Sequence, residues 1–166
     1  MKVELHLHTS RYSECAILTP DQAMLAVLEY RYDAVFLTEH DAVWSDYELA
    51  QLQAGFPELR VFPGVELTLG GLEGQHLLVL GTNDPAYPAM RNDATAVLDK
   101  ARDDGHLTVL AHPYRYDDGS SIIDEGLPPD AIELRTNNHG PEHGPAVQAA
   151  AALLDIAPVN AGDSHD

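Results

Sequence analysis

The feature that most limits the possible folds is an alternation of short apolar runs with amphipathic stretches along the chain. The runs 34–38 and 107–111 have the length and composition of buried strands. Strands that alternate with helices predict a parallel sheet covered by helices. The chain has 166 residues, which is enough for one hydrophobic core. We therefore expect a single α/β domain over residues 1–166, with roughly seven strands in a barrel related to the TIM type.

Local signals place the other elements. Thr19, followed by a proline, marks the start of a helix, and a capping box begins at Ser45. The runs 65–69 and 76–80, separated by glycines 70, 71 and 74, predict a hairpin, and the Pro/Gly/Asp-rich segment 114–129 predicts a loop. Further strands are expected at 60–62, 131–135 and 157–161, and further helices at about 87–103 and 145–154.

The charge of the chain excludes some partners. A formal net charge of −18 repels long polyanions, so we expect no binding of long nucleic acid. The longest apolar runs, such as 77–80 and 149–154, are too short to span a membrane, and the first residues lack the apolar region of a signal peptide. We therefore expect a cytoplasmic protein without a membrane partner, and the single cysteine, Cys15, agrees with a reducing compartment. The sequence leaves the oligomeric state open.

The first apolar run carries two histidines, in Val3-Glu4-Leu5-His6-Leu7-His8-Thr9. Because side chains alternate across a strand, we expect His6 and His8 on one face and Leu5 and Leu7 on the other. Other polar residues also follow apolar runs, and in a barrel of parallel strands these ends share the face that carries the chemistry. They are His8, His40, His112, Asn137 and Asp163.

Each of these residues also has an ordinary interpretation. Glu66 could face solvent from an edge strand, His112 could be a structural histidine, and residues 163–165 could be a frayed tail. In the hairpin, however, Glu66 and His76 could meet across the turn. Burying several carboxylates and imidazoles together is costly unless they are paired or bind metal, so the complete set favours a metal site. Histidine with carboxylate ligands suits Zn²⁺, Mn²⁺ or Fe²⁺ better than Ca²⁺.

In its motifs and their order the chain resembles the PHP (polymerase and histidinol phosphatase) domain family, whose members are metal-dependent phosphoesterases. The resemblance extends over essentially the whole chain. The matching elements are "HLHT" at 6–9, "TEHD" at 38–41, "PGVE" at 63–66, His76, "AHPYR" at 111–115 and "GDSHD" at 162–166.

The resemblance implies a distorted (β/α)7 barrel with two or three divalent ions, Zn, Mn or Fe, at the C-terminal ends of its strands. Glu66 is then expected to bridge two ions and to be catalytic. Glu14 is the candidate for the third ion, with Cys15 as the alternative, and if neither binds only two ions are expected. One ion would take His6, His8, Glu66 and Asp163, a second Glu66, His76 and His112, and a third His40, His165 and Glu14.

Two features depart from the family pattern. Glu39 stands before His40 where an aspartate is usual. The chain stops at Asp166, where similar proteins continue into a further helix. We therefore expect a barrel that is incomplete at its C-terminal end or closes differently.

The resemblance and the ligand set predict a phosphoesterase that uses metal-activated hydroxide on a small phosphate mono- or diester. A nucleotide, a short oligonucleotide or a compound like histidinol phosphate would suit it. Arg11 and Arg115 each follow a motif histidine and are predicted to hold phosphate oxygens in catalysis, or else to be ordinary surface residues. The alternatives are an amidohydrolase-like metal hydrolase and a non-catalytic metal-binding PHP module of an assembly.

Overall fold

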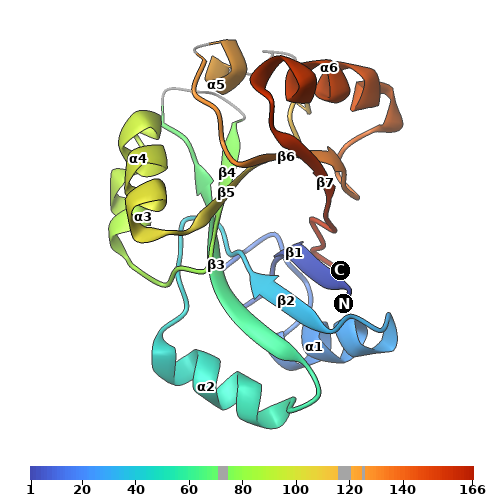
Figure 1. Ribbon diagram of the computed structural model, residues 1–166. Coiled ribbons are helices and arrows are strands. Elements are labelled where there is room, and N and C mark those ends of the chain that lie inside the picture. Colours follow the sequence, from blue (N-terminus) through green and yellow to red (C-terminus); the bar gives the residue numbers. More distant parts are fainter. Residues whose placement is uncertain (71–74, 116–120, 125) are drawn as a thin grey trace.

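The computed structural model describes residues 1–70, 75–115, 121–124 and 126–166. Seven strands form one sheet in sequential order, and the sheet curls so that its first and last strands approach each other (Figure 1). The helices lie on the outside of this curl (Figure 1). The strands are β1 Val3–Leu7, β2 Ala34–Leu37, β3 Arg60–Thr68, β4 His76–Leu80, β5 Leu107–Ala111, β6 Ala131–Arg135 and β7 Ala157–Asn160. The helices are α1 Pro20–Glu29, α2 Asp46–Gly55, α3 Ala86–Met90, α4 Ala94–Asp104, α5 Ser121–Asp124 and α6 Gly144–Leu154, with a 3₁₀ turn at Pro141–His143.

The sheet is mixed and open, which corrects the expectation of a parallel (β/α)7 barrel. Strand β4 is antiparallel to both β3 and β5, because the segment 69–75 between β3 and β4 is too short for a helical crossover. This confirms the predicted hairpin. Within the described residues β1 and β7 share no ladder, and one bridge between Leu7 and Ser164 joins the two sides. The α/β class agrees with the sequence analysis, and all of the expected strands are present in the open sheet.

Strand β1 departs from simple alternation. Its pairing with β2 shifts by one residue between Glu4 and Leu7, as at a β-bulge. Leu5 consequently packs inside the curl against Leu78 and Val109, whereas Leu7 packs toward α1 with Met24. The prediction that Leu5 and Leu7 share a face is therefore wrong, although His6 and His8 do converge.

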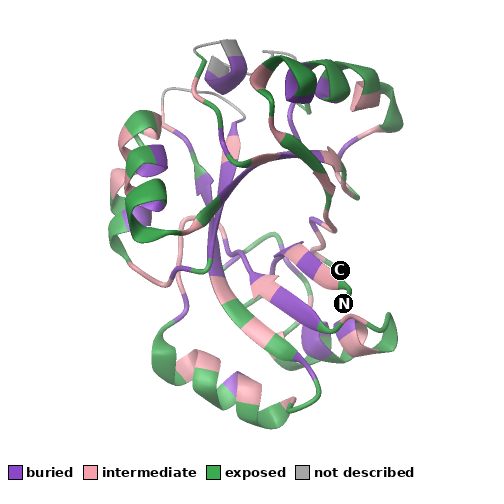
Figure 2. Cartoon of the chain, in the orientation of Figure 1, coloured by how far each residue is buried: buried purple, intermediate pink, exposed green. Residues whose placement is uncertain are grey.

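The apolar core lies mainly between the sheet and its helices (Figure 2). One cluster joins β3 to β6 with α3, α4 and α6, and a second joins β1 and β2 with α1 and α2. A smaller cluster, centred on Leu78, Leu80, Val109 and Ala111, fills the inside of the curl. These layers hold the strands rigidly, so side chains at the strand ends are fixed relative to one another.

The predicted helix starts are confirmed. Thr19 caps α1 and Ser45 caps α2, each with a complete capping box. The single helix expected at about 87–103 is instead two, because the Asp93 side chain accepts a hydrogen bond from the Ala96 N–H and starts α4 anew. Helix α5 lies in the segment predicted as a loop, while residues 116–120 and 125 of that segment, and glycines 71 and 74 of the hairpin, lie outside the described residues. No helix in the described part of the chain is long and apolar enough to cross a membrane.

Candidate metal centre

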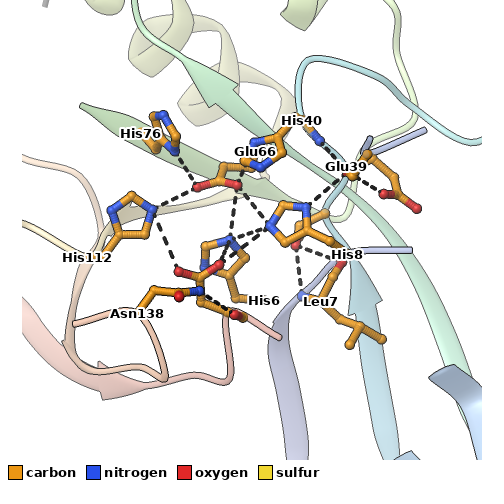
Figure 3. A network of polar contacts seen from close by, with 12 residues as sticks. His6, Leu7, His8, Glu39, His40, Glu66, His76, His112 and Asn138 are labelled. Atoms are coloured by element: carbon orange, nitrogen blue, oxygen red, sulfur yellow. Dashed lines mark hydrogen bonds and ion pairs between the residues drawn. The ribbon is translucent and has the colours of Figure 1, made fainter. Parts of the chain in front are cut away.

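Glu66, near the end of β3, is fully buried and lies at the centre of a group of histidines (Figure 3). Its two oxygens face different partners, so the carboxylate divides the group into two halves. Oε1 lies 2.7 Å from His76 Nδ1 and 3.1 Å from His112 Nε2, while Oε2 lies 3.2 Å from His6 Nε2, 3.0 Å from His8 Nε2 and 3.0 Å from His40 Nδ1.

The direction of β4 explains why His76 belongs to this group. As the first residue of an antiparallel strand it stands opposite Ala111, the last residue of β5. His76 therefore reaches the same end of the sheet as the C-terminal ends of β3 and β5, and His112 follows directly.

Asp163 brings a second carboxylate into the group from the segment after β7. Its side chain is 1% exposed, and Oδ1 lies 3.5 Å from His6 Nε2 and 3.7 Å from His8 Nε2. The backbone of Asp163 is left-handed, with φ of 49°, a conformation that aspartate tolerates better than most residues. Its carbonyl oxygen accepts a hydrogen bond of 2.8 Å from Asn138 Nδ2, which fixes the segment.

The ring of His8 is oriented by a chain of hydrogen bonds. Ser13 Oγ donates to Glu39 Oε2 at 2.6 Å, so it can only accept at its contacts with His8 Nδ1, at 3.1 Å, and with the His40 N–H. The proton of His8 therefore sits on Nδ1, and the lone pair of Nε2 faces Glu66.

Burial and charge act in opposite directions on these groups. Burial lowers the pKa of His8 to about 4, which keeps the ring neutral with a free lone pair. Burial also lowers the pKa of His6, but Glu66 and Glu133 outweigh it and raise that pKa well above its ordinary value. Burial raises the pKa of Glu66, yet His6, followed by His112 and His40, brings it well below the usual range. The site thus favours ionised carboxylates and positive charge between them.

The donor set fits divalent cations. The Nε2 atoms of His6 and His8 lie 3.0 Å apart, and a proton or a metal ion must separate two such acceptors. Glu66 Oε2 and both oxygens of Asp163 are buried without a hydrogen bond from any described residue. Unpaired buried oxygens of this kind are costly unless a cation binds them. Imidazole and carboxylate donors in combination are typical of zinc, manganese and iron sites.

Among the described residues, three groups of side chains have ligand atoms within 4.8 Å of one another. They contain all of the predicted ligands except Glu14 and His112, and His112 contacts the set through Glu66 Oε1 at 3.1 Å. His165 also stacks on His8, with ring centroids 4.3 Å apart. Their role as ligands stays a prediction. The groups are His6, His8 and Asp163; His40, Glu66 and His76; and His8, His40 and His165.

Glu14 and Cys15, the candidates for the third ion, are both exposed. Neither belongs to a possible ligand group among the described residues, where His8 completes the group of His40 and His165. Burial raises the pKa of the Cys15 thiol, and the carboxylate of Glu66 adds to this, so the thiolate is disfavoured. The imidazoles of His40 and His165 thus lie near that of His8 and not near Glu14 or Cys15, and a third ion stays a prediction.

The two arginines lie in different surroundings. Arg115 Nη1 is 3.7 Å from Asp163 Oδ2, beside the histidines. Arg11 instead donates to Glu48 Oε1 at 2.6 Å and 3.2 Å, and more than half of its side chain is exposed. The predicted contact of each arginine with phosphate remains a prediction.

Several supporting residues were not predicted. Glu133 contacts His6 and His112, Glu39 holds Ser13, and Glu4 accepts hydrogen bonds from the N–H groups of His6 and Gly162. The available signal was a glutamate within or beside an apolar strand, but such residues commonly face solvent. A cavity of about 490 Å³ between α1 and the C-terminal segment is lined by residues such as Lys2 and Tyr30, and by none of the clustered histidines. The buried unpaired carboxylate oxygens lie among the histidines and not at this cavity.

No known family profile matches the chain, and no curated protein matches it. Solved structures do. A structure of an amidohydrolase from Chromobacterium violaceum, with bound sulfate and no metal, aligns over 99% of this chain and 88% of its own, with 14% identity and a TM-score of 0.71. A protein provisionally assigned as a metal-dependent phosphoesterase from Bifidobacterium adolescentis aligns over 100% and 88%, with 15% identity and a TM-score of 0.75. PsfC from Pseudomonas syringae PB-5123 aligns over 99% and 75%, with 16% identity and a TM-score of 0.64. The chain shares their fold.

Proposed function

We propose that this protein is a metal-dependent hydrolase of the PHP type that cleaves phosphate esters of small molecules. The observation that carries the proposal is the buried group around Glu66, in which imidazole nitrogens converge on three carboxylate oxygens, Glu66 Oε2 and both of Asp163, that have no hydrogen bond from the described residues. A group bound only by hydrogen bonds would contain as many donors as acceptors. This group contains a surplus of acceptors, as a site for cations does.

The arrangement supports two or three ions, of zinc, manganese or iron. Bound divalent ions supply a water of lowered pKa and charge stabilisation for phosphate oxygens. Glu66 can face two ion positions because its oxygens point to separate histidines. One position would use His6, His8, Glu66 and Asp163, a second Glu66, His76 and His112, and a third His8, His40 and His165.

The residues at the open side of the group would receive the substrate. His40 and His165 are partly exposed, whereas His6, His8 and Glu66 are buried, so access is from the His40 side. Arg115 is close enough to Asp163 to hold a phosphate oxygen beside the histidines, and its guanidinium matches phosphate geometry. The net charge of −18 opposes long polyanions, which favours a small phosphorylated substrate.

Hydrolysis of a C–N bond is the second candidate, because the similar Chromobacterium violaceum protein is described as an amidohydrolase. Its bound sulfate has the shape and charge of a phosphate group, which favours the phosphoesterase. A non-catalytic metal module is disfavoured, because nearly every motif that resembles the PHP family carries a histidine or a carboxylate at its ligand position.

The test is metal analysis of the purified protein, together with hydrolysis of p-nitrophenyl phosphate, its bis-ester and a p-nitroanilide in added Mn²⁺, Zn²⁺ or Fe²⁺. We expect two or three ions per chain and phosphate-ester cleavage that a chelator abolishes. Anilide cleavage alone would favour the amidohydrolase. Bound metal without turnover of any substrate would favour the non-catalytic module, and failure to take up micromolar metal would overturn the proposal.

A further inference from the structure

Glu133 lies in β6, a strand that contributes none of the clustered ligands, yet it contacts two of them. Its side chain is fully buried. Oε1 lies 2.8 Å from His6 Nδ1, and Oε2 accepts a hydrogen bond of 2.7 Å from the backbone N–H of His112. Because β1 and β6 are not neighbours in the sheet, this carboxylate reaches across the inside of the curl.

The contact with His6 decides which ring nitrogen can bind metal. An ionised carboxylate only accepts hydrogen bonds, so a proton must sit on Nδ1 of His6. The other nitrogen, Nε2, is then the one that carries a lone pair, and it faces Glu66 and Asp163. Carboxylates that hold a metal-binding histidine in this way fix both its tautomer and its orientation.

The contact with His112 holds an unusual backbone. His112 has φ of 28°, which is unfavourable for a residue with a side chain, and it precedes Pro113. The N–H of His112 donates a hydrogen bond to the buried Oε2 of Glu133, and this bond stabilises the turn. The same turn places His112 Nε2 at 3.1 Å from Glu66 Oε1.

We propose that Glu133 is a positioning residue that fixes the orientation of both His6 and His112, and thereby couples the two ion positions on either side of Glu66. The inference rests on the proposed function in that both histidines are taken as metal ligands. One oxygen of Glu133 orients His6 at the first ion position, and the other orients His112 at the second. A change at either oxygen therefore alters metal binding at one position relative to the other.

Glu133→Gln is the sharpest variant, because it keeps the shape and removes one acceptor. If the amide oxygen accepts the hydrogen bond from His6, the NH₂ group faces the backbone N–H of His112, and two donors then oppose each other. If the NH₂ group faces His6, then Nδ1 must accept, and the proton moves to Nε2, the nitrogen that binds metal. Either arrangement weakens metal binding, by about 10- to 100-fold for a partner of this kind.

Glu4→Gln is the matched control. Glu4 is also a buried glutamate near His6, but its Oε1 accepts both the His6 and the Gly162 N–H groups, and an amide oxygen can keep both bonds. We expect its Zn²⁺ affinity, measured by calorimetry, to stay within about threefold of wild type, and that of Glu133→Gln to fall at least tenfold.

A spectroscopic readout separates positioning from general loss of structure. Long-range ¹H–¹⁵N NMR of the zinc-loaded wild-type protein should show His6 protonated on Nδ1, and this needs no variant to fold. A proton on Nε2 of His6 in that spectrum would overturn the inference, as would equal Zn²⁺ affinity of wild type and Glu133→Gln. Failure of the wild type itself to bind Zn²⁺ would overturn the proposed function, and this inference with it.

Discussion

Two glutamates of this protein each lie at the centre of a group of polar side chains, called here the Glu48 ring and the Glu66 ring. The two groups differ in their balance of hydrogen-bond donors and acceptors. Glu48, at the start of α2, accepts hydrogen bonds from Arg11, Tyr12 and Ser45, which are all donors. Glu66 is surrounded by imidazoles whose other nitrogens are in part already engaged, and its Oε2 accepts no hydrogen bond from the described residues. The Glu48 ring lies at the surface and the Glu66 ring is buried.

The comparison separates a structural network from a binding site. A network that stabilises a fold balances donors and acceptors, as the one around Glu48 does. A site that requires a cation accumulates acceptors, and burial makes the imbalance costly. The following experiments test whether the two rings differ in this way.

The largest effect is expected from Glu66→Gln. The amide replaces one acceptor oxygen with a donor, so one ion position loses a ligand atom, and the other keeps a neutral amide oxygen in place of a charged carboxylate oxygen. We expect hydrolysis of the phosphate ester to fall by about 10³-fold, with loss of bound metal measured by elemental analysis. Glu58→Gln, at an exposed position outside the group, is the control and should retain both. Full metal content in Glu66→Gln would contradict the assignment of Glu66 as a bridge.

Removal of metal by a chelator should destabilise the native state through the Glu66 ring and leave the contacts of the Glu48 ring unchanged. At free metal 100 times its dissociation constant, binding stabilises the native state by about 2.7 kcal/mol. For a protein of this size that corresponds to about 5–10 °C in Tm. Calorimetry with and without chelator measures the shift. A Tm that chelation leaves unchanged in the wild type would show that the Glu66 ring does not bind metal in the native state.

His165→Ala tests the partly exposed side of the Glu66 ring. His165 belongs to only one of the three ligand groups. We expect the number of bound ions to fall by one while the other ions remain, and Tm to fall by less than it does when a chelator removes all of the ions. Glu14→Ala, as its control, should leave the metal content intact. Loss of an ion in Glu14→Ala and not in His165→Ala would restore Glu14 as the third ligand.

Each ring lies beside an arginine that is predicted to hold a phosphate oxygen of the substrate. Arg115→Ala should raise KM for a phosphate ester by about 10- to 100-fold, because a charge-assisted hydrogen bond contributes roughly 1.5–3 kcal/mol. Arg11→Ala should raise KM less, since Glu48 already holds that guanidinium. Steady-state kinetics of the two variants decide this. Equal effects would show that Arg11 leaves Glu48 to contact the substrate, as the sequence predicts.

The smallest effect concerns the pH dependence of the Glu48 ring. Hydrogen bonds from Ser45, Tyr12 and Arg11 lower the pKa of Glu48 from about 4.5 to about 2. A lowered pKa in the folded state stabilises the protein above pH 4.5, and this stability is lost as the pH falls toward 2. Glu48→Gln should therefore reduce the difference in Tm between pH 7 and pH 3 by no more than about 2 °C, because the site is at the surface. A larger reduction would mean that Glu48 contributes as much as a buried carboxylate.

Much of the site followed from the sequence because each clustered side chain ends an apolar run or stands in one. His8, His40, His112 and Asp163 were placed correctly at one end of the sheet for that reason. The bulge in β1 and the role of Glu133 were not predictable. A glutamate within a strand looks solvent-facing until the curl of the sheet brings it opposite a histidine 127 residues away.

The hydrogen bond from the N–H of Gly162 to the Glu4 side chain joins residues that are 158 apart in the sequence. It lies beside the Leu7 and Ser164 bridge and next to Asp163, so it brings the predicted ligand Asp163 to the end of β1. Contacts at such separation form late, because the entropy of closing the intervening chain must first be overcome. We therefore expect the segment after β7 to join β1 only after the sheet between them has formed. Under the proposed function, metal would bind to a sheet that is already folded and would not nucleate its folding.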